Sequence, residues 1–232
     1  LGSGTLDIAD LWRQLRRKYL LKDHPDYEAS WQKLRALTEH YKGTIETALP
    51  SGLSLDRKDE IDELSKRVTN DRVCVVYGES GSGKSALIKT LLDESFPNAA
   101  QVWFGPDTLE LALNEAARTS LGINQPLVDL LDASPRADNF LVIDAAERLG
   151  HDSTLKAKAL IESLKRRNAS EASIGWHVLI VGQTEAWARG TLQELAGTAS
   201  PSNFEVEGLR DETVKDVLRS VADLEWLGMD SD

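Results

Sequence analysis

The sequence has little of several features that define common protein classes. It contains a single cysteine, Cys74, so no disulfide framework can form within the chain, which suits a reducing compartment. No run of residues approaches the ~18 to 20 consecutive apolar residues that span a bilayer, and the N-terminus lacks the apolar core of a signal peptide. These absences predict a soluble, cytoplasmic protein that does not insert into a membrane.

Basic residues are outnumbered by acidic ones. Lys and Arg together number 27 against 38 Asp and Glu, which gives a formal net charge of −11 at pH 7. Such a surplus of negative charge disfavours sequence-independent binding to nucleic acid. The basic cluster between Arg13 and Lys22 could contact phosphate or a partner, although a run of this kind more often forms the solvated face of a helix. Nucleic acid is therefore not an expected partner.

One motif carries a specific chemistry. Residues 78–85 read G-E-S-G-S-G-K-S, which matches the phosphate-binding P-loop pattern G-x-x-x-x-G-K-[ST], between the apolar run Val73–Tyr77 and the helix-like stretch Ala86–Leu92. A glycine-rich turn can aim backbone N–H groups at phosphate oxygens, and the helix that follows adds its positive N-terminal end. Lys84 would place a charge on the β and γ phosphates, and Ser85 would ligate the bridging Mg²⁺. The sequence thus predicts a site for ATP or ADP with Mg²⁺. The residues that we expect to contact the nucleotide are Gly78, Glu79, Ser80, Gly81, Ser82, Gly83, Lys84, Ser85 and Ala86.

A second motif lies about sixty residues after Lys84. Phe140–Asp144 is an apolar run that ends in a carboxylate, the Walker B pattern, in which the Asp holds Mg²⁺ directly or through water. Ala145 and Ala146 follow, so the position where many ATPases place a Glu has no carboxylate. Glu147 is the nearest candidate to orient or deprotonate the attacking water, or it forms an ion pair with Arg148 instead. The predicted catalytic residues are Lys84, Asp144 and Glu147, and the predicted metal ligands are Ser85 and Asp144.

Polar residues also close a later apolar run. Val178–Val181 leads into Gly182, Gln183 and Thr184. In a parallel sheet this position would lie near the γ-phosphate, so Gln183 or Thr184 could sense the phosphate or position water. Equally, polar residues at the end of a strand are common as turn caps. We include Gln183 among the predicted nucleotide-binding residues.

Apolar runs alternate with helical stretches from Leu53 onward, which predicts a parallel sheet covered by helices. The predicted strands are Arg72–Tyr77, Gln101–Phe104, Phe140–Asp144, His177–Val181 and Phe204–Val206. The predicted helices are Lys58–Val68, Lys84–Leu92, Thr108–Ser120, Thr154–Arg167, Leu192–Ala196 and Asp211–Leu224. Before Leu53 the helical period predicts two more helices, Asp7–Leu20 and a second from Pro25 towards Leu49. We therefore predict an α/β fold: a three-layer P-loop NTPase with a mostly parallel five-stranded sheet, preceded by an N-terminal helical segment.

With these motifs in place, the segment from about Leu53 to Leu224 resembles a STAND-type P-loop NTPase, near the NACHT and bacterial antiviral ATPases. Those families are similar in having a small residue directly after the Walker B Asp, here Ala145, and an acidic residue a few positions on, here Glu147. Residues 54–57 with Glu60 and Leu64 also resemble the linker and helix that lie near the adenine, which implies that Arg57 contacts the nucleotide. Arg148 departs from the second acid that is common in NACHT proteins. The strand end at 182–184 also lacks their usual arginine, so efficient turnover is not expected.

The resemblance implies a nucleotide-driven switch in which ATP locks an open or oligomeric form, with a role in antiviral defence signalling among the expectations. It divides the chain into an N-terminal helical segment at 1–52 that links or oligomerises, an NTPase core at 53–207, and at 208–232 the start of a helical lid that the sequence does not complete. The expected partners are nucleotide, further copies of the chain, or other domains of a longer protein.

Two other functions stay open. One is a nucleotide-stabilised scaffold with little hydrolysis, which Ala145 and Arg148 favour. The other is a small-molecule kinase, which is less expected because Arg189 is the only arginine between Gly182 and Glu207, where a kinase lid would need several.

Overall fold

A parallel five-stranded sheet forms the centre of the computed structural model, which describes residues 27–48, 57–134, 138–168, 175–198 and 200–208. The strands lie in the order β2-β3-β4-β1-β5, and every neighbouring pair is parallel. Their bounds are β1 Val73–Gly78, β2 Ala100–Phe104, β3 Asp138–Ile143, β4 Gly175–Gln183 and β5 Ser202–Glu205. The five predicted strands are confirmed, with shifts of a few residues at their ends.

The strands form because their residues are apolar on both faces, as a covered parallel sheet requires. Every residue of β1 is buried, and β4 is buried from Trp176 to Gly182. Successive residues of β1 point to opposite faces: Val73 and Val75 belong to one hydrophobic cluster, and Cys74 and Val76 to the other. The chain therefore needs a layer of helices on each side of the sheet.

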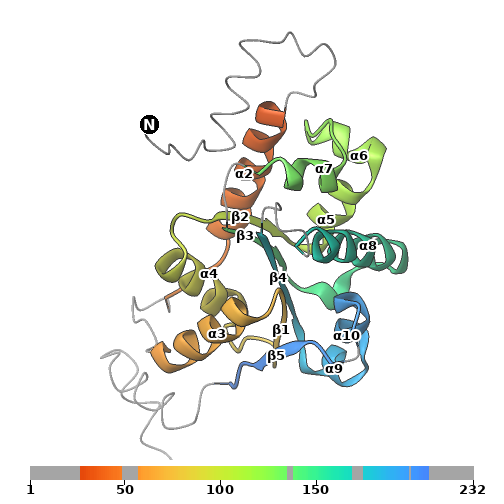
Figure 1. Cartoon of the computed structure of the whole chain (residues 1–232). Helices are drawn as coiled ribbons and strands as arrows, with labels where there is room; N and C mark the ends of the chain where they lie inside the picture. Colours follow the sequence, from red (N-terminus) through yellow and green to blue (C-terminus); the bar gives the residue numbers. More distant parts are fainter. Residues whose placement is uncertain (1–26, 49–56, 135–137, 169–174, 199, 209–232) are drawn as a thin grey trace, which may run out of the picture.

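Helices supply these two layers, as Figure 1 shows. On one face lie α3 (Lys58–Asn70) and α4 (Lys84–Ser95), whose apolar residues share a cluster with Phe140 and Val181. The opposite face is covered by a larger group of helices. These are α5 (Pro106–Leu113), α7 (Leu127–Asp132), α8 (His151–Asn168), α9 (Thr184–Ala188) and α10 (Thr191–Ala196). The three-layer architecture is confirmed.

Helix α2 (Tyr27–Gly43) lies along the edge strand β2. Trp31 and Leu34 are buried in the cluster on the α8 side, and Tyr41 packs against the cluster on the α4 side. The Thr38 hydroxyl accepts a hydrogen bond of 3.1 Å from the backbone N–H of Trp103 in β2. This contact occupies a donor of the edge strand, which would otherwise have no strand partner.

Some predicted elements differ from the structure. The stretch predicted as one helix, Thr108–Ser120, is two helices, α5 and α6 (Glu115–Ser120), because the Asn114 side chain caps α6 by accepting from two backbone amides. The second N-terminal helix ends at Gly43, earlier than predicted, and α7 and α9 were not predicted. The predicted helices at 7–20 and 211–224 lie outside the described residues.

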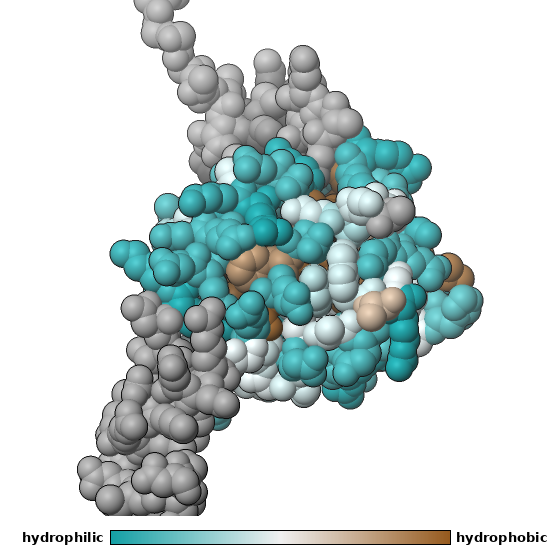
Figure 2. Space-filling view, turned by 90° about the horizontal axis from the view of Figure 1, so that it is seen from below, coloured by the Kyte–Doolittle hydropathy of each residue, from teal (hydrophilic) through white to brown (hydrophobic). Residues whose placement is uncertain are grey.

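The surface of the described part is mostly polar. Its exposed large hydrophobic side chains are Leu111 and Leu155. Figure 2 shows one face, seen from below, on which the hydrophobic colour is confined to small areas among hydrophilic residues. None of the helices in the described ranges is both long enough and apolar enough to cross a bilayer.

Candidate nucleotide-binding site

The loop between β1 and α4 has a backbone that only glycine adopts readily. Gly81 has a φ of 78° and Gly83, the residue before α4, a φ of 83°. Both angles lie in the left-handed region, where a side chain would be strained. The loop ends where α4 begins, at Lys84, and the first amides of a helix have no partners within it. The sequence therefore builds a tight turn that runs into a helix N-terminus, as an anion site requires.

Close packing also explains Gly78. A Cβ at this position would lie 2.3 Å from the carbonyl oxygen of Val206. The Val206 N–H in turn donates to the Tyr77 carbonyl at 2.7 Å. The chain after β5 thus lies against the start of the loop and leaves room only for glycine.

Lys84 reaches back over the loop. Its Nζ donates to the carbonyls of Gly78 at 3.0 Å and Glu79 at 2.6 Å. Burial lowers the pKa of the Lys84 ammonium, and the carboxylates of Glu147 and Asp144 act in the opposite direction. The ammonium therefore lies close to the predicted phosphate-binding loop and within the field of both predicted carboxylates. Of the other loop residues, Glu79, Ser80 and Gly81 are exposed, Ser82 is buried, and Ser85 and Ala86 are half-buried in the first turn of α4.

Asp144 follows β3 directly and is only 6% exposed. Its Oδ1 accepts from the N–H of Ala145 at 2.8 Å, and its Oδ2 accepts from the hydroxyl of Tyr41 at 3.1 Å. Burial and the Asp144 carboxylate raise the pKa of Tyr41, so the hydroxyl keeps its proton and donates. Ala145 has a φ of 50°, a left-handed conformation that alanine rarely adopts. Backbone strain of this kind tends to collect at functional sites.

Glu147 lies in the short 3-10 turn Ala146–Arg148, and one of its carboxylate oxygens, Oε2, is buried without a hydrogen-bond partner in the described part of the chain. A Cβ on Gly182 would lie 3.2 Å from this oxygen. No ion pair joins Glu147 to Arg148 in the described ranges. A buried carboxylate oxygen with no partner is costly unless a ligand, a metal or water satisfies it.

The end of β4 lies beside the loop. Gln183 pairs in register with Gly78, so the residue that we predicted from the sequence is brought to the start of the P-loop. The hydroxyl of the next residue, Thr184, is buried without a partner among the residues described. Glu185, one residue further, is exposed. Thr184 thus joins Gln183 at this edge of the sheet.

Arg57, which precedes α3, contacts the loop through its side chain. It donates to the Ser82 carbonyl at 2.7 Å and to the Glu207 carbonyl at 3.2 Å, and it forms an ion pair with Glu60 at 2.5 Å. A Cβ on Gly83 would lie 2.8 Å from its Nη1. These contacts support a role in holding the loop in place, while direct contact of Arg57 with a nucleotide stays a prediction.

Comparison with known proteins agrees with this arrangement. The sequence model of a family described as Novel STAND NTPase 1 matches residues 53–230. The chain belongs to this STAND NTPase family. A search of curated proteins finds no match.

The fold of this STAND NTPase is similar to those of solved P-loop ATPases. Cdc6p from Pyrobaculum aerophilum matches with a TM-score of 0.51 and 20% identity, over 75% of this chain and 50% of that one. AMPPCP-bound DnaA from Aquifex aeolicus matches with a TM-score of 0.51 and 11% identity, over 75% of this chain and 55% of that one. The Orc1 protein of Aeropyrum pernix, solved in complex with DNA, matches with a TM-score of 0.53 and 14% identity, over 84% of this chain and 53% of that one. The STAND NTPase chain thus spans about half the length of these proteins, and the similarity concerns the fold.

The residues present fit a Mg²⁺-bound nucleotide. Within the parts of the chain that the structure describes, no three His, Cys, Asp or Glu side chains gather to form a metal site by themselves. Mg²⁺ in nucleotide enzymes takes one or two protein oxygens and completes its shell with phosphates and waters. Ser85 and Asp144 match such a small donor set, and the unpartnered oxygen of Glu147 matches a site that admits water.

Sequence reasoning missed Tyr41. Tyr41 continues the apolar spacing of a helix, a pattern that predicts a core residue and says nothing about Asp144.

Proposed function

We propose that this STAND NTPase domain binds ATP or ADP with Mg²⁺ at the β1–α4 loop and acts as a slow, nucleotide-dependent switch. The observation that carries the proposal is the left-handed glycine turn at Gly81 and Gly83 that leads directly into the N-terminus of α4, with Lys84 Nζ folded back onto the loop. In an NTPase, bound Mg²⁺ neutralises phosphate charge. The chain's own groups then have defined roles: the loop and Lys84 bind phosphate, and Ser85 with Asp144 would hold the metal.

Glu147 is the group that we assign to the attacking water. Its Oε2 is buried and has no hydrogen-bond partner in the described structure, so it can accept a proton or a hydrogen bond from a water molecule. We assign the sensing of the γ-phosphate to Gln183 and Thr184 at the end of β4, because Gln183 pairs with Gly78 at the start of the loop. Hydrolysis is expected to be slow, because Ala145 leaves no carboxylate directly after Asp144.

The first test measures binding of a fluorescent ATP analogue to the wild type, Lys84→Ala and Lys156→Ala, in which an exposed lysine of α8 is changed. A charge-assisted hydrogen bond is worth about 1.5–3 kcal/mol, so Lys84→Ala should weaken binding roughly 10- to 100-fold. Lys156→Ala should bind as the wild type does. Equal affinity in all three proteins would contradict the assignment of the phosphate site.

A nucleotide-stabilised scaffold is the second candidate, favoured by the lack of a carboxylate at Ala145 and Ala146. Phosphate release from Glu147→Gln separates the two functions. For the switch, turnover should fall on the order of 100-fold while nucleotide affinity is kept, since the amide cannot act as a base. A wild type that binds nucleotide tightly without measurable turnover would support the scaffold.

Assembly and biological context are further parts of this proposal. Self-association, or contact with other domains, would convert the nucleotide state into an output, and the defence role comes from the family resemblance alone. The A. pernix protein was solved with DNA, but the net charge of −11 gives no reason to extend that partner to this chain.

A further inference from the structure

The last turn of α2 reaches the predicted metal site from outside the β1–α4 core. The hydroxyl of Tyr41 donates to Oδ2 of Asp144 at 3.1 Å, although the two residues are 103 positions apart in the sequence. The Tyr41 ring fills the space over Gly105, where a Cβ would lie 2.6 Å from the ring. The ring is therefore held by packing, and the hydroxyl is aimed at one carboxylate oxygen.

This hydrogen bond completes the support of Asp144. The Ala145 N–H holds Oδ1 at 2.8 Å, so each oxygen of the carboxylate has one donor from the protein. Each carboxylate oxygen can accept a second interaction, so both remain able to bind a metal or a metal-bound water. Partners of this kind fix the orientation of a metal-binding carboxylate, and their loss typically lowers metal affinity about 10- to 100-fold.

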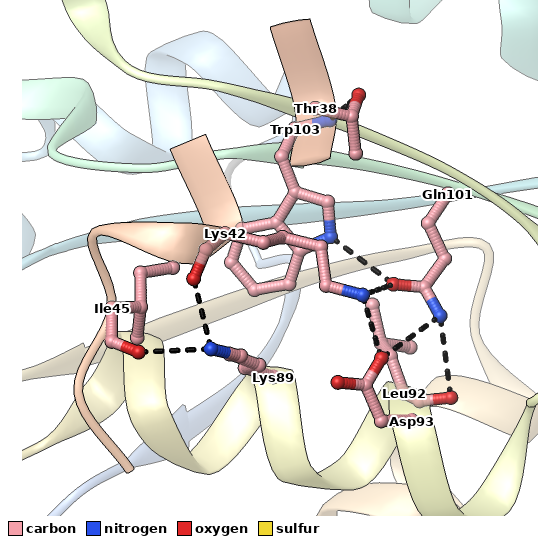
Figure 3. Close-up of polar contacts among 8 residues, drawn as sticks. All are labelled: Thr38, Lys42, Ile45, Lys89, Leu92, Asp93, Gln101 and Trp103. Atoms are coloured by element: carbon pink, nitrogen blue, oxygen red, sulfur yellow. Dashed lines mark hydrogen bonds and ion pairs between the residues drawn. The ribbon is translucent and has the colours of Figure 1, made fainter. Parts of the chain in front are cut away.

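The same turn is fastened to α4, the helix that begins at the P-loop, as Figure 3 shows. Lys42 Nζ donates to Asp93 of α4 at 2.6 Å and to Gln101 of β2 at 2.9 Å. In the reverse direction, Lys89 of α4 donates to the backbone carbonyls of Lys42 at 2.8 Å and Ile45 at 2.9 Å. The end of α2 therefore contacts Asp144 through Tyr41, and through Lys42 it contacts the end of α4 that lies away from the P-loop.

We propose that Tyr41 is a positioning residue that holds Asp144 in the orientation needed for Mg²⁺, and that α2 thereby senses the nucleotide state of the domain. The inference rests on the function proposed above. If Mg²⁺ binding depends on the Tyr41 contact, then by linkage the stability of that contact depends equally on Mg²⁺. The helix before the predicted NTPase core is in this way coupled to the proposed metal site through Asp144.

The test compares the wild type, Tyr41→Phe and Tyr27→Phe in the full chain. Tyr41→Phe keeps the ring over Gly105 and removes only the hydroxyl. Tyr27→Phe makes the same change about 21 Å away along the same helix. Each protein is titrated with a fluorescent ATP analogue in EDTA, and then with Mg²⁺ at fixed analogue concentration.

In Tyr41→Phe, we expect the Mg²⁺ concentration that gives the half-maximal change in analogue fluorescence to rise about tenfold. The affinity of this variant for the analogue in EDTA should be unchanged, and Tyr27→Phe should behave as the wild type does in both titrations. An unchanged Mg²⁺ dependence would overturn the inference and leave the proposed function intact. An equal loss of affinity with and without Mg²⁺ would assign Tyr41 a purely structural role and also overturn it. A wild type that binds no nucleotide under either condition would remove both proposals together.

Hydrogen exchange of the wild type gives a second readout that needs no variant. Adding Mg²⁺ to the nucleotide-bound protein should slow amide exchange several-fold in residues 41–45, relative to the first turns of α2. The same exchange rates before and after Mg²⁺ would contradict the coupling.

Discussion

Several residues around the predicted phosphate-binding loop adopt left-handed backbone conformations, which are unfavourable for residues other than glycine. Ala145 is held in the left-handed region, which costs an L-amino acid about 1–2 kcal/mol, and it directly follows Asp144, the carboxylate that we assign to the metal. Gly81 and Gly83 avoid the same cost by having no Cβ. Strain and glycine thus occur together where β1 and β3 end, at the edge that carries the proposed chemistry.

Gly78 gives the clearest test at this scale. In Gly78→Ala the new methyl group would lie 2.3 Å from the carbonyl oxygen of Val206, so the backbone must move. Overpacking of this kind costs roughly 1–3 kcal/mol, which should appear as a lower free energy of unfolding in urea. Gly43→Ala is the matched control, because a Cβ there meets nothing within 4 Å, and it should be neutral or raise stability by up to about 1 kcal/mol. Equal destabilisation by the two changes would show that the contact with Val206 does not matter.

At the scale of elements, α2 packs firmly against the sheet although it precedes the predicted NTPase core. Trp31 and Leu34 are buried beside the sheet, and Thr38 binds the edge strand β2. Lys42 is only 9% exposed and is held by Asp93 and Gln101, so the helix is joined to the core by polar contacts as well as apolar ones. A helix anchored in this way must shift when the strands beneath it shift, whereas a loosely attached segment need not.

Replacing Lys42 tests this anchoring. Lys42→Met keeps the length and the apolar stem of the side chain and removes both hydrogen bonds. Because the Asp93 side chain is 45% exposed, water can replace its lost partner, and we expect a loss of only about 1–2 kcal/mol in the free energy of unfolding. Lys66→Met, at an exposed position of α3, should change it by less than about 0.5 kcal/mol. Urea unfolding of the two variants measures the difference, and a Lys42→Met protein as stable as the control would mean that the cluster contributes nothing.

Sequence patterns predicted the elements that are buried on both faces and missed those that depend on tertiary contacts. Val73–Tyr77 is short, rich in β-branched residues and apolar at nearly every position, as is typical of a strand that is covered on both faces. The break at Asn114 was missed because a polar residue inside an amphipathic stretch also fits an unbroken helix, and only its bonds to two amides reveal a cap. The motifs located Lys84 and Asp144. No local signal brings Tyr41 to Asp144, because that contact exists only once α2 is folded against the sheet.

For the molecule as a whole, the proposed site occupies one end of the sheet only. The nucleotide loop, Asp144 and Gln183 lie at the carboxyl ends of the strands, whereas His177 lies near the start of β4, about 20 Å away along the strand. His177 is buried, stacks on Phe140 with ring centroids 5.1 Å apart, and lies 2.9 Å from the Arg72 guanidinium. This histidine can therefore report on the stability of the fold without being part of the proposed site.

The stability of the whole domain should accordingly depend on pH through His177. Burial, followed by the charge of Arg72, lowers the pKa of His177 below its ordinary value of 6.5. As the pH falls through 6.5, the ordinary pKa of histidine, the unfolded chain takes up a proton that the folded protein does not yet accept. The free energy of unfolding therefore decreases. The contribution is fully present above about pH 6.5 and is lost progressively below it.

Urea unfolding at several pH values tests this dependence. His177→Gln should flatten the fall in stability between roughly pH 6.5 and pH 5, whereas His40→Gln, at an exposed position of α2, should keep the wild-type slope. If the His177→Gln and wild-type curves stayed parallel over this range, the acid sensitivity would have to come from other groups and the folded protein would accept the His177 proton as readily as the unfolded chain does.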